Sequence, residues 1–137
     1  MQAFISIQDF GVHRVFFADD LGIASIFNDL KNRLAEVKYQ HISLFYCSIN
    51  KQHLFKKELK ILQKHFPTQL FISYHSKESA GHCGIKQEDI EAILNANTMQ
   101  HMQFTISGND AFVENIRLSL IFLGIEKVQI QEQFFSE

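Results

Sequence analysis

The sequence contains few of the residues that mark several large classes of protein. Its two cysteines, Cys47 and Cys83, are too few for a disulfide framework and stand in unrelated contexts. We therefore expect free thiols in a reducing compartment. There is no excess of basic residues either: the formal net charge is −2, which argues against a protein that binds nucleic acid through its phosphates. No apolar run approaches the ~20 residues that a membrane span needs.

The beginning of the chain lacks the features of a targeting segment. The first ten residues include the acidic Asp9 and no basic n-region, so they do not match a secretory signal peptide. We therefore expect a cytoplasmic protein. The length of 137 residues fits one domain, and 46% hydrophobic with 20% charged residues is typical of a soluble globular chain. We assign that domain to residues 13–137 and interpret residues 1–12 as an N-terminal extension or the remnant of a preceding domain.

Segments with the pattern of strands alternate with segments that have the spacing of helices. Short runs rich in Phe, Ile, Val and Tyr predict strands, and apolar residues at three- and four-residue intervals predict amphipathic helices between them. The expected strands are Arg14–Ala18, His41–Cys47, Gln69–Tyr74, Met102–Ile106 and Lys127–Gln131. The expected helices are Ile23–Leu34, Phe55–Phe66, Gln87–Leu94 and Asp110–Leu123. This alternation is typical of a doubly wound α/β fold, a parallel sheet with helices on both faces.

Punctuating residues mark the helix ends. Pro67 ends the second helix, because proline cannot continue it. Asp110 is expected to cap the last helix, since its carboxylate can accept hydrogen bonds from the free N–H groups of the first turn. Gly124 is expected to stop that helix.

In a doubly wound sheet, ligands lie beyond the carboxyl ends of the strands, where the strand order reverses. The loops after the first and fourth strands are therefore the candidate site. They span residues 18–25 and 106–110.

These loops and several other segments resemble, in order and spacing, the nucleotide-binding domain of ferredoxin-reductase-like flavoenzymes. Val15–Ser25 resembles that family's first strand with its Gly-Gly-Thr-Gly-Ile-Ala-Pro loop, and Ile106-Ser107-Gly108 resembles its Cys-Gly-Pro segment. The likeness covers roughly residues 13–135 and implies a five-stranded sheet of order 3-2-1-4-5. The other matching segments are Leu44-Phe45-Tyr46, Leu54-Phe55, Glu58-Leu59, Gly81 with Gly84, Phe112-Val113, Leu123-Gly124-Ile125, Glu132 and Phe134.

The resemblance implies NAD(P)H as the cofactor of an oxidoreductase, with no catalytic acid or base and no metal. The cofactor-binding residues that it implies are Gly22, Ile23, Ala24 and Ser25 at the first helix, Ser48 and Lys51 after the second strand, and Ser107, Gly108 and Asn109 beside the nicotinamide. Family members hold FAD or FMN in a flavin-binding barrel domain, for which 137 residues leave no room. The expected partner is therefore that barrel domain or another electron-transfer partner.

The chain departs from the family where the phosphates should bind. Asp19 and Asp20 replace the two leading glycines. A carboxylate ~4–6 Å from a phosphate would repel it by about 3–4 kcal/mol at an effective dielectric near 20. Two functions therefore stay open: a working NAD(P)H-binding domain, or a degenerate domain that serves as an interaction or regulatory module. An accidental likeness is a third alternative, which a different strand order would reveal.

Each candidate residue also has a purely structural interpretation. Gly22 fits an ordinary strand-to-helix turn in which the neighbouring aspartates cap the helix. Phe134, which matches a residue near the flavin, also fits simple packing. A metal site at His75, His82 and Cys83 does not match a usual zinc spacing.

Overall fold

The computed structural model describes residues 11–36, 41–49, 52–76, 84–99 and 101–136. Lys51, His82 and Cys83 lie outside these ranges, as does most of the expected N-terminal segment. The strands are β1 (Val12–Ala18), β2 (His41–Ser48), β3 (Leu70–Ser76), β4 (His101–Gly108) and β5 (Ile130–Phe134). They form one parallel sheet of order β3-β2-β1-β4-β5. The predicted fold and strand order are therefore confirmed, and the alternative of a different order is wrong.

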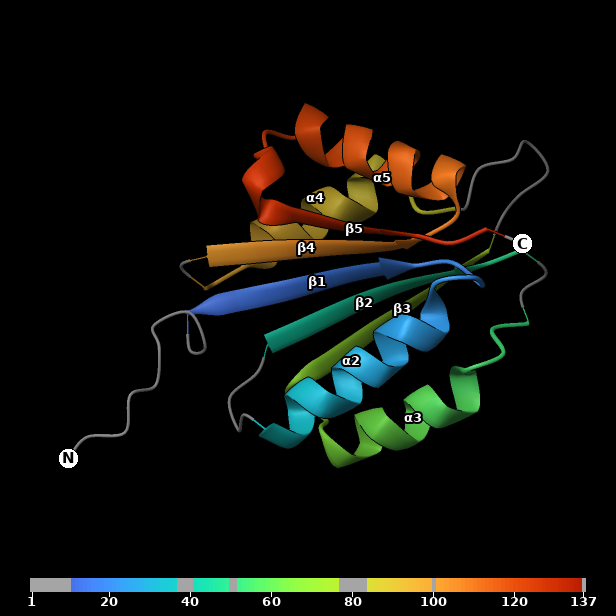
Figure 1. Cartoon of the computed structure of the whole chain (residues 1–137). Helices are drawn as coiled ribbons and strands as arrows, with labels where there is room; N and C mark the ends of the chain where they lie inside the picture. Colours follow the sequence, from blue (N-terminus) through green and yellow to red (C-terminus); the bar gives the residue numbers. More distant parts are fainter. Residues whose placement is uncertain (1–10, 37–40, 50–51, 77–83, 100, 137) are drawn as a thin grey trace.

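Helices cover both faces of the sheet (Figure 1). They are α2 (Ile23–Glu36), α3 (Lys56–His65), α4 (Gln87–Ala96) and α5 (Asp110–Phe122). One apolar core joins α2 and α3 to one face, and a second core joins α4 and α5 to the other. This layering results from parallel topology, because every connection must cross over the sheet.

The central strand β1 supplies both cores. Val15 and Phe17 point toward α4 and α5, whereas Phe16 and Ala18 point toward α2. All four side chains are buried, as expected for a strand covered on both faces. The end of β1 is consequently fixed in space, and so is the loop that follows it.

Two boundaries at the C-terminal end differ from the sequence prediction. Asn109, and not Asp110, caps α5: its side chain accepts a hydrogen bond from the Phe112 N–H at 2.8 Å. Lys127–Gln129 forms a 3₁₀ turn, so β5 begins only at Ile130, where it comes alongside Phe104 of β4. The sequence does not distinguish the two caps, because Asn and Asp are equally good at this position. The start of β5 depends on its register with β4, which the residue pattern does not specify.

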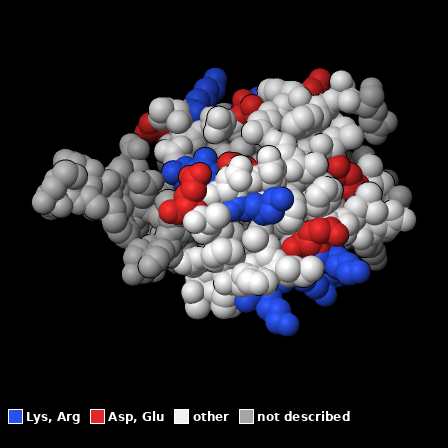
Figure 2. Space-filling model, turned by 60° about the horizontal axis from the view of Figure 1, so that its bottom comes forward, with Lys and Arg blue, Asp and Glu red and all other residues white. Residues whose placement is uncertain are grey.

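Charges of both signs are interspersed on the face shown in Figure 2, with uncharged surface between them. The described helices include none that is long and apolar enough to cross a membrane. No cluster of His, Cys, Asp and Glu within the described ranges could hold a metal ion. The metal alternative at His75, His82 and Cys83 stays untested, because His82 and Cys83 lie outside those ranges.

Candidate functional site

The candidate site lies at the carboxyl ends of β1 and β4, where the strand order reverses. β1 pairs with β2 on one side and with β4 on the other. The loop from Asp19 to Gly22 leads into α2, and Asn109 leads into α5. Two helix N-termini, where backbone N–H groups lack acceptors within the helix, therefore meet at this edge.

A carboxylate of the chain itself occupies the meeting point. Asp19 Oδ1 accepts hydrogen bonds from the backbone N–H groups of Leu21 at 2.9 Å and Gly22 at 3.0 Å. Asp19 Oδ2 accepts from the backbone N–H of Asn109 at 2.9 Å. Three amides from two loops thus surround one anion, which is the arrangement that protein anion sites use.

Two glycines make this arrangement sterically feasible. A Cβ at Gly108 would come within 2.5 Å of the Asp19 carboxyl carbon. A Cβ at Gly22 would overlap the carbonyl oxygen of Ser107. Both glycines are therefore needed for contacts inside the protein, whether or not a ligand binds.

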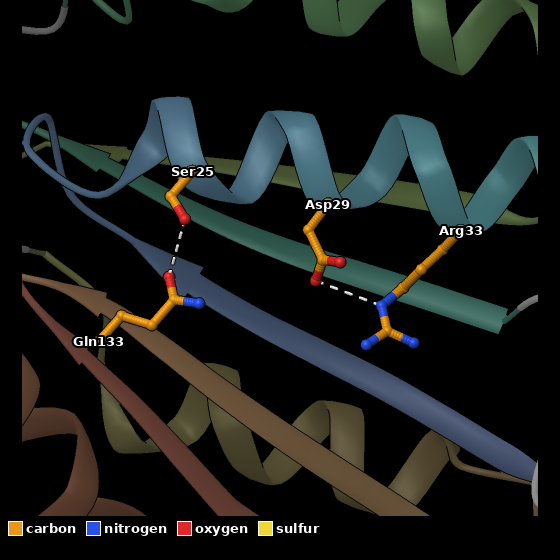
Figure 3. Close-up of polar contacts among 4 residues, drawn as sticks. All are labelled: Ser25, Asp29, Arg33 and Gln133. Atoms are coloured by element: carbon orange, nitrogen blue, oxygen red, sulfur yellow. Dashed lines mark hydrogen bonds and ion pairs between the residues drawn. The ribbon is translucent and has the colours of Figure 1, made fainter.

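Side-chain hydrogen bonds close the region between α2, β4 and β5. The hydroxyl of Ser25 donates to Gln133 Oε1 at 3.0 Å (Figure 3). The hydroxyl of Ser107, which is fully buried, donates to the same oxygen at 2.9 Å. Farther along α2, Asp29 and Arg33 pair with each other at 3.2 Å (Figure 3). The polar groups beside Asp19 are therefore already paired within the chain.

The neighbouring aspartate reaches the other side of the edge, at the end of β2. Asp20 Oδ2 accepts hydrogen bonds from the Ser48 hydroxyl at 3.3 Å and the backbone N–H of Ile49 at 3.1 Å. Ser48 in turn accepts from the backbone N–H of His53 at 3.3 Å. Asp20 Oδ1 is buried and has no hydrogen-bond partner among the described residues. This half of the site is thus only partly satisfied.

Two tyrosines extend the unsatisfied region between β2, β3 and α3. Neither the Tyr46 nor the Tyr74 hydroxyl has a hydrogen-bond partner of normal geometry in the described part of the chain. Burial raises the pKa of Tyr46 to about 12; the backbone N–H of Phe55 lowers that pKa, and the Asp20 carboxylate adds to the rise. Burial also raises the pKa of Tyr74. Both tyrosines are therefore neutral hydroxyls at physiological pH.

His53 contacts the backbone of β2 and β3 beside these tyrosines. Its backbone has φ 42°, in the left-handed region that non-glycine residues rarely adopt. Its Nε2 lies 3.2 Å from the Tyr46 carbonyl oxygen and 2.8 Å from that of His75. The ring stands edge-on to Tyr46 and Tyr74, with centroids 4.8 and 5.1 Å away. The packing of these rings holds the residue in its strained conformation.

The structure brings together five of the nine predicted cofactor-binding residues at the Asp19 side: Gly22, Ser25, Ser107, Gly108 and Asn109. Ser48 lies at the Asp20 side. Ile23 is a buried core residue and Ala24 is exposed on α2. Lys51 lies outside the described residues. The assignment of these residues to cofactor binding stays a prediction.

Sequence reasoning missed Gln133, Tyr46, His53 and Tyr74 as parts of this edge. Gln133 pairs with Ser107 in the strand register, but no motif marks it. The tyrosines resemble ordinary core residues of β2 and β3. Their position beside Asp20 depends on strand pairing, which the sequence pattern does not specify in detail.

The two sides of the site differ in the polar groups that a dinucleotide would meet. A pyrophosphate would need the amides of Leu21, Gly22 and Asn109, which Asp19 now occupies. As arranged, the phosphate position does not accept a second anion. At the Asp20 side, one carboxylate oxygen and two neutral tyrosine hydroxyls are buried without hydrogen-bond partners among the described residues.

A separate polar cluster lies at the opposite ends of the strands. His13 Nε2 lies 2.8 Å from the Ser43 hydroxyl, and its Nδ1 lies 3.2 Å from Asn97 Oδ1. Asn97 Oδ1 also accepts from the Met99 N–H, so we assign the ring proton to Nδ1 and the acceptor to Nε2. Burial, helped by nearby His41, lowers the pKa of His13 to about 4. His13 and Ser43 are 2% and 4% exposed, so this hydrogen-bonded array is structural.

Comparison with solved structures shows that several other proteins share this fold. The chain resembles the CS-b5R domains of human Ncb5or in its NAD+ form, with a TM-score of 0.73, 17% identity, and coverage of 96% of this chain and 39% of that one. A point mutant of ferredoxin-NADP+ reductase from Plasmodium falciparum gives a TM-score of 0.72 at 20% identity, covering 94% of this chain and 54% of that one.

The flavohem-like FAD/NAD-binding domain of nitric oxide dioxygenase from Vibrio cholerae O1 biovar El Tor gives a TM-score of 0.63 at 17% identity, over 98% of this chain and 54% of that one. This chain thus spans 39% to 54% of the length of these structures. No protein-family model and no curated protein sequence matches it. At this level of identity the likeness concerns the fold, and it confirms the ferredoxin-reductase-like nucleotide-domain architecture that the resemblance implied.

Proposed function

We propose that this chain is the NAD(P)H-binding domain of a flavin-dependent oxidoreductase. The carrying observation is that the backbone N–H groups of Leu21, Gly22 and Asn109 converge on a single anion at the point where the strand order reverses. Doubly wound folds bind nucleotide phosphates at this place. In the proposed complex a phosphate takes the position of the Asp19 carboxylate, which rotates toward solvent.

The remaining chemistry would come from cofactors. The nicotinamide would lie beside Ser107 and Gly108 and supply a hydride to FAD or FMN held by a flavin-binding barrel domain or another electron-transfer partner. The residues of this chain would bind and orient the nucleotide, and no general acid or base is required. The likeness to reductase structures that span a larger chain supports this division of labour.

The test is a titration of the full chain with NADH, NADPH and ADP, followed by backbone amide chemical shifts. We expect saturable shifts at Gly22, Ser107 and Asn109, because these amides line the phosphate and nicotinamide positions. Asp19→Gly removes the competing carboxylate and should bind each nucleotide about tenfold or more tightly. Asp110→Asn removes a charge from an exposed residue of α5 and should change little.

A second candidate function is an interaction or regulatory module without redox activity. The internal occupation of the amides by Asp19, together with the paired Ser25, Ser107 and Gln133, favours it. The same titration separates the two candidates. Binding by wild type supports the NAD(P)H-binding domain, whereas binding by Asp19→Gly alone supports a degenerate site. Absence of binding in both proteins would contradict the first proposal and the use of this edge for nucleotides.

A further inference from the structure

The two outer strands of the sheet differ in how their free edges are protected. β5 is five residues long and carries Glu132, which pairs with Arg117 of α5. β3 is seven residues long and contains no lysine, arginine, acidic residue or proline. Charges, prolines and short length are the usual features that keep an edge strand from pairing with another chain. The β3 edge lacks all of them, so it is suited to accept an additional strand.

The hydrogen-bond pattern shows which backbone groups of β3 point away from β2. The Ile42 N–H donates to the Gln69 carbonyl oxygen at 2.8 Å. Because bonded residues alternate along a parallel strand pair, Ile72 and Tyr74 direct their N–H and C=O groups to the outer side. No hydrogen bond to these four outward groups occurs within the described ranges.

Both ends of the β3 edge are closed, which limits the free part to its centre. The Leu70 carbonyl oxygen accepts a hydrogen bond from Gln63 Nε2 at 3.2 Å, and the Leu70 N–H donates to the Phe66 carbonyl oxygen at 3.1 Å. At the other end Gly84 lies against Ser76, since a Cβ on this glycine would come within 2.2 Å of the Ser76 carbonyl oxygen. An added strand would therefore bond to the four outward groups at the centre.

Two lysines of α3 flank the free edge on one face of the sheet. Lys56 Nζ lies 5.0 Å from the centre of the Tyr74 ring, over the ring face. Lys60 follows one turn later, on the side of the helix from which Gln63 reaches the backbone of β3. Both lysines are exposed, and neither forms an ion pair within the described ranges. Glu58, the one acidic residue of α3, is two positions from each lysine and therefore projects from a different side.

The other face of the same edge is aromatic. Phe71 is 45% exposed, and its ring centroid lies 5.6 Å from that of His41. His75 stacks on Phe45 with ring centroids 5.6 Å apart, and its Nε2 lies 2.8 Å from the hydroxyl of the exposed Ser73. Side chains of a strand alternate between the two faces, so an added strand would meet lysines with one set of side chains and aromatic rings with the other.

We propose that the β3 edge binds an extended segment of a partner protein in which acidic residues alternate with apolar ones. The segment adds to the sheet as a further strand, with main-chain hydrogen bonds to Ile72 and Tyr74. Its acidic side chains face Lys56 and Lys60, where the charge is complementary, and its apolar side chains cover Phe71. This site is separate from the carboxyl edge and does not depend on nucleotide binding.

A second copy of this chain fits the edge less well. Two antiparallel β3 strands would be related by a two-fold axis perpendicular to the sheet, which places both α3 helices on the same face. Lys56 and Lys60 of the two copies would then approach each other, and like charges across paired strands are destabilising. Charge complementarity therefore favours an acidic partner over self-association.

The test uses the full chain and three synthetic heptapeptides, each acetylated and amidated. The first alternates valine with glutamate, the second alternates valine with lysine, and the third is the first with every backbone nitrogen methylated. We expect the valine–glutamate peptide to bind about tenfold or more tightly than the valine–lysine peptide, because only its charge is complementary. The methylated peptide should not bind, since it has no N–H to donate. Hydrogen exchange of the Ile72 and Tyr74 amides should slow in the complex.

Matched lysine variants separate the flanking charges from the net charge of the protein. Lys56→Gln combined with Lys60→Gln should weaken binding of the valine–glutamate peptide about tenfold. Lys31→Gln combined with Lys127→Gln removes the same charge from α2 and the 3₁₀ turn, and should leave the affinity unchanged.

Each outcome decides the proposal. Slower exchange at Ile72 and Tyr74, together with the expected order of affinities, supports it. Equal binding of the methylated peptide would show association by charge alone and overturns strand addition. Absence of binding by the valine–glutamate peptide, or equal effects of the two double variants, also overturns the proposal. Protection of both amides without peptide, in a chain that sedimentation equilibrium shows to be a dimer, would assign the edge to a second copy and exclude the acidic partner.

Discussion

The two halves of the carboxyl edge begin from adjacent aspartates and end in opposite states. Asp19 lies under the β1–β4 half, where it accepts three backbone hydrogen bonds, and Ser25 and Ser107 share Gln133. Asp20 turns to the β2–β3 half, where one carboxylate oxygen and two tyrosine hydroxyls lack partners among the described residues. The first half is satisfied by hydrogen bonds within the chain, and the second contains buried polar atoms that are not. Satisfied groups contribute to stability, whereas unsatisfied buried groups gain most from a ligand.

The largest effect is expected from Gly22→Ala, which tests how tightly the satisfied half is packed. A Cβ at Gly22 would overlap the backbone carbonyl of Ser107, and backbone cannot move aside as a side chain can. We expect a loss of about 3 kcal/mol or more in the free energy of unfolding. Urea denaturation followed by circular dichroism measures it. A loss below about 1 kcal/mol would show that the two loops are not packed as described.

The second largest effect is expected from acid titration, which measures the contribution of His13 to stability. His13 lies away from the carboxyl edge. The pKa of His13 is about 4 in the folded protein, below the ordinary histidine value of 6.5, so the unfolded chain binds the proton more readily. The contribution of neutral His13 is complete above pH 6.5 and is lost as the pH falls toward 4. It amounts to on the order of 3 kcal/mol.

The variant His13→Gln separates this loss from that of the carboxyl edge. Wild type should lose stability between pH 6.5 and 4, and the variant should show a flatter profile in the same window. Urea unfolding at several pH values provides both curves. Parallel profiles would mean that the acid sensitivity comes from groups other than His13.

Substitution of Asp19 tests the β1–β4 half of the carboxyl edge directly. Asp19→Ala leaves the Leu21, Gly22 and Asn109 amides without their acceptor, and we expect a loss of about 2 kcal/mol. Asp19→Asn retains one acceptor oxygen and should lose about half as much. Equal losses in the two variants would show that the acceptor oxygen retained in Asp19→Asn contributes nothing to stability.

A double-mutant cycle shows whether Gly108 serves the same contact. Gly108→Ala alone should destabilise by about 1–2 kcal/mol, because its Cβ would meet the Asp19 carboxyl group at 2.5 Å. In an Asp19→Ala background the obstacle is gone and the loss should shrink to a few tenths of a kcal/mol. Additive losses in the double variant would show that the added Cβ clashes with a group other than the Asp19 carboxylate.

The smallest effect is expected in the β2–β3 half, from a substitution of Asp20. Asp20→Asn keeps the acceptor for the Ser48 hydroxyl and the Ile49 N–H, so the free energy of unfolding should change by less than about 1 kcal/mol. Thermal unfolding of the two proteins side by side measures it. A loss as large as that of Asp19→Ala would remove the distinction between the two halves.

Sequence reasoning located the elements well and the details of the site less completely. The alternation of strand and helix patterns predicted the order of elements, and Gly124, with φ +94°, ends α5 as expected. The loop containing Asp19 was found because it follows a short apolar strand. Its hydrogen bond to the Asn109 N–H was not predictable, because the two residues are 90 positions apart in the chain.

The sequence by itself determined a parallel α/β sheet, the location of its carboxyl edge and the presence of two acidic residues there, because these follow from local periodicity and residue type. Tertiary structure alone decided that Asp19 closes one half of the edge while Asp20 reaches β2 and leaves an oxygen without a partner among the described residues. The physical reason is that a carboxylate is most stable where several hydrogen-bond donors surround it. The donors here come from loops that only the folding of the sheet brings together.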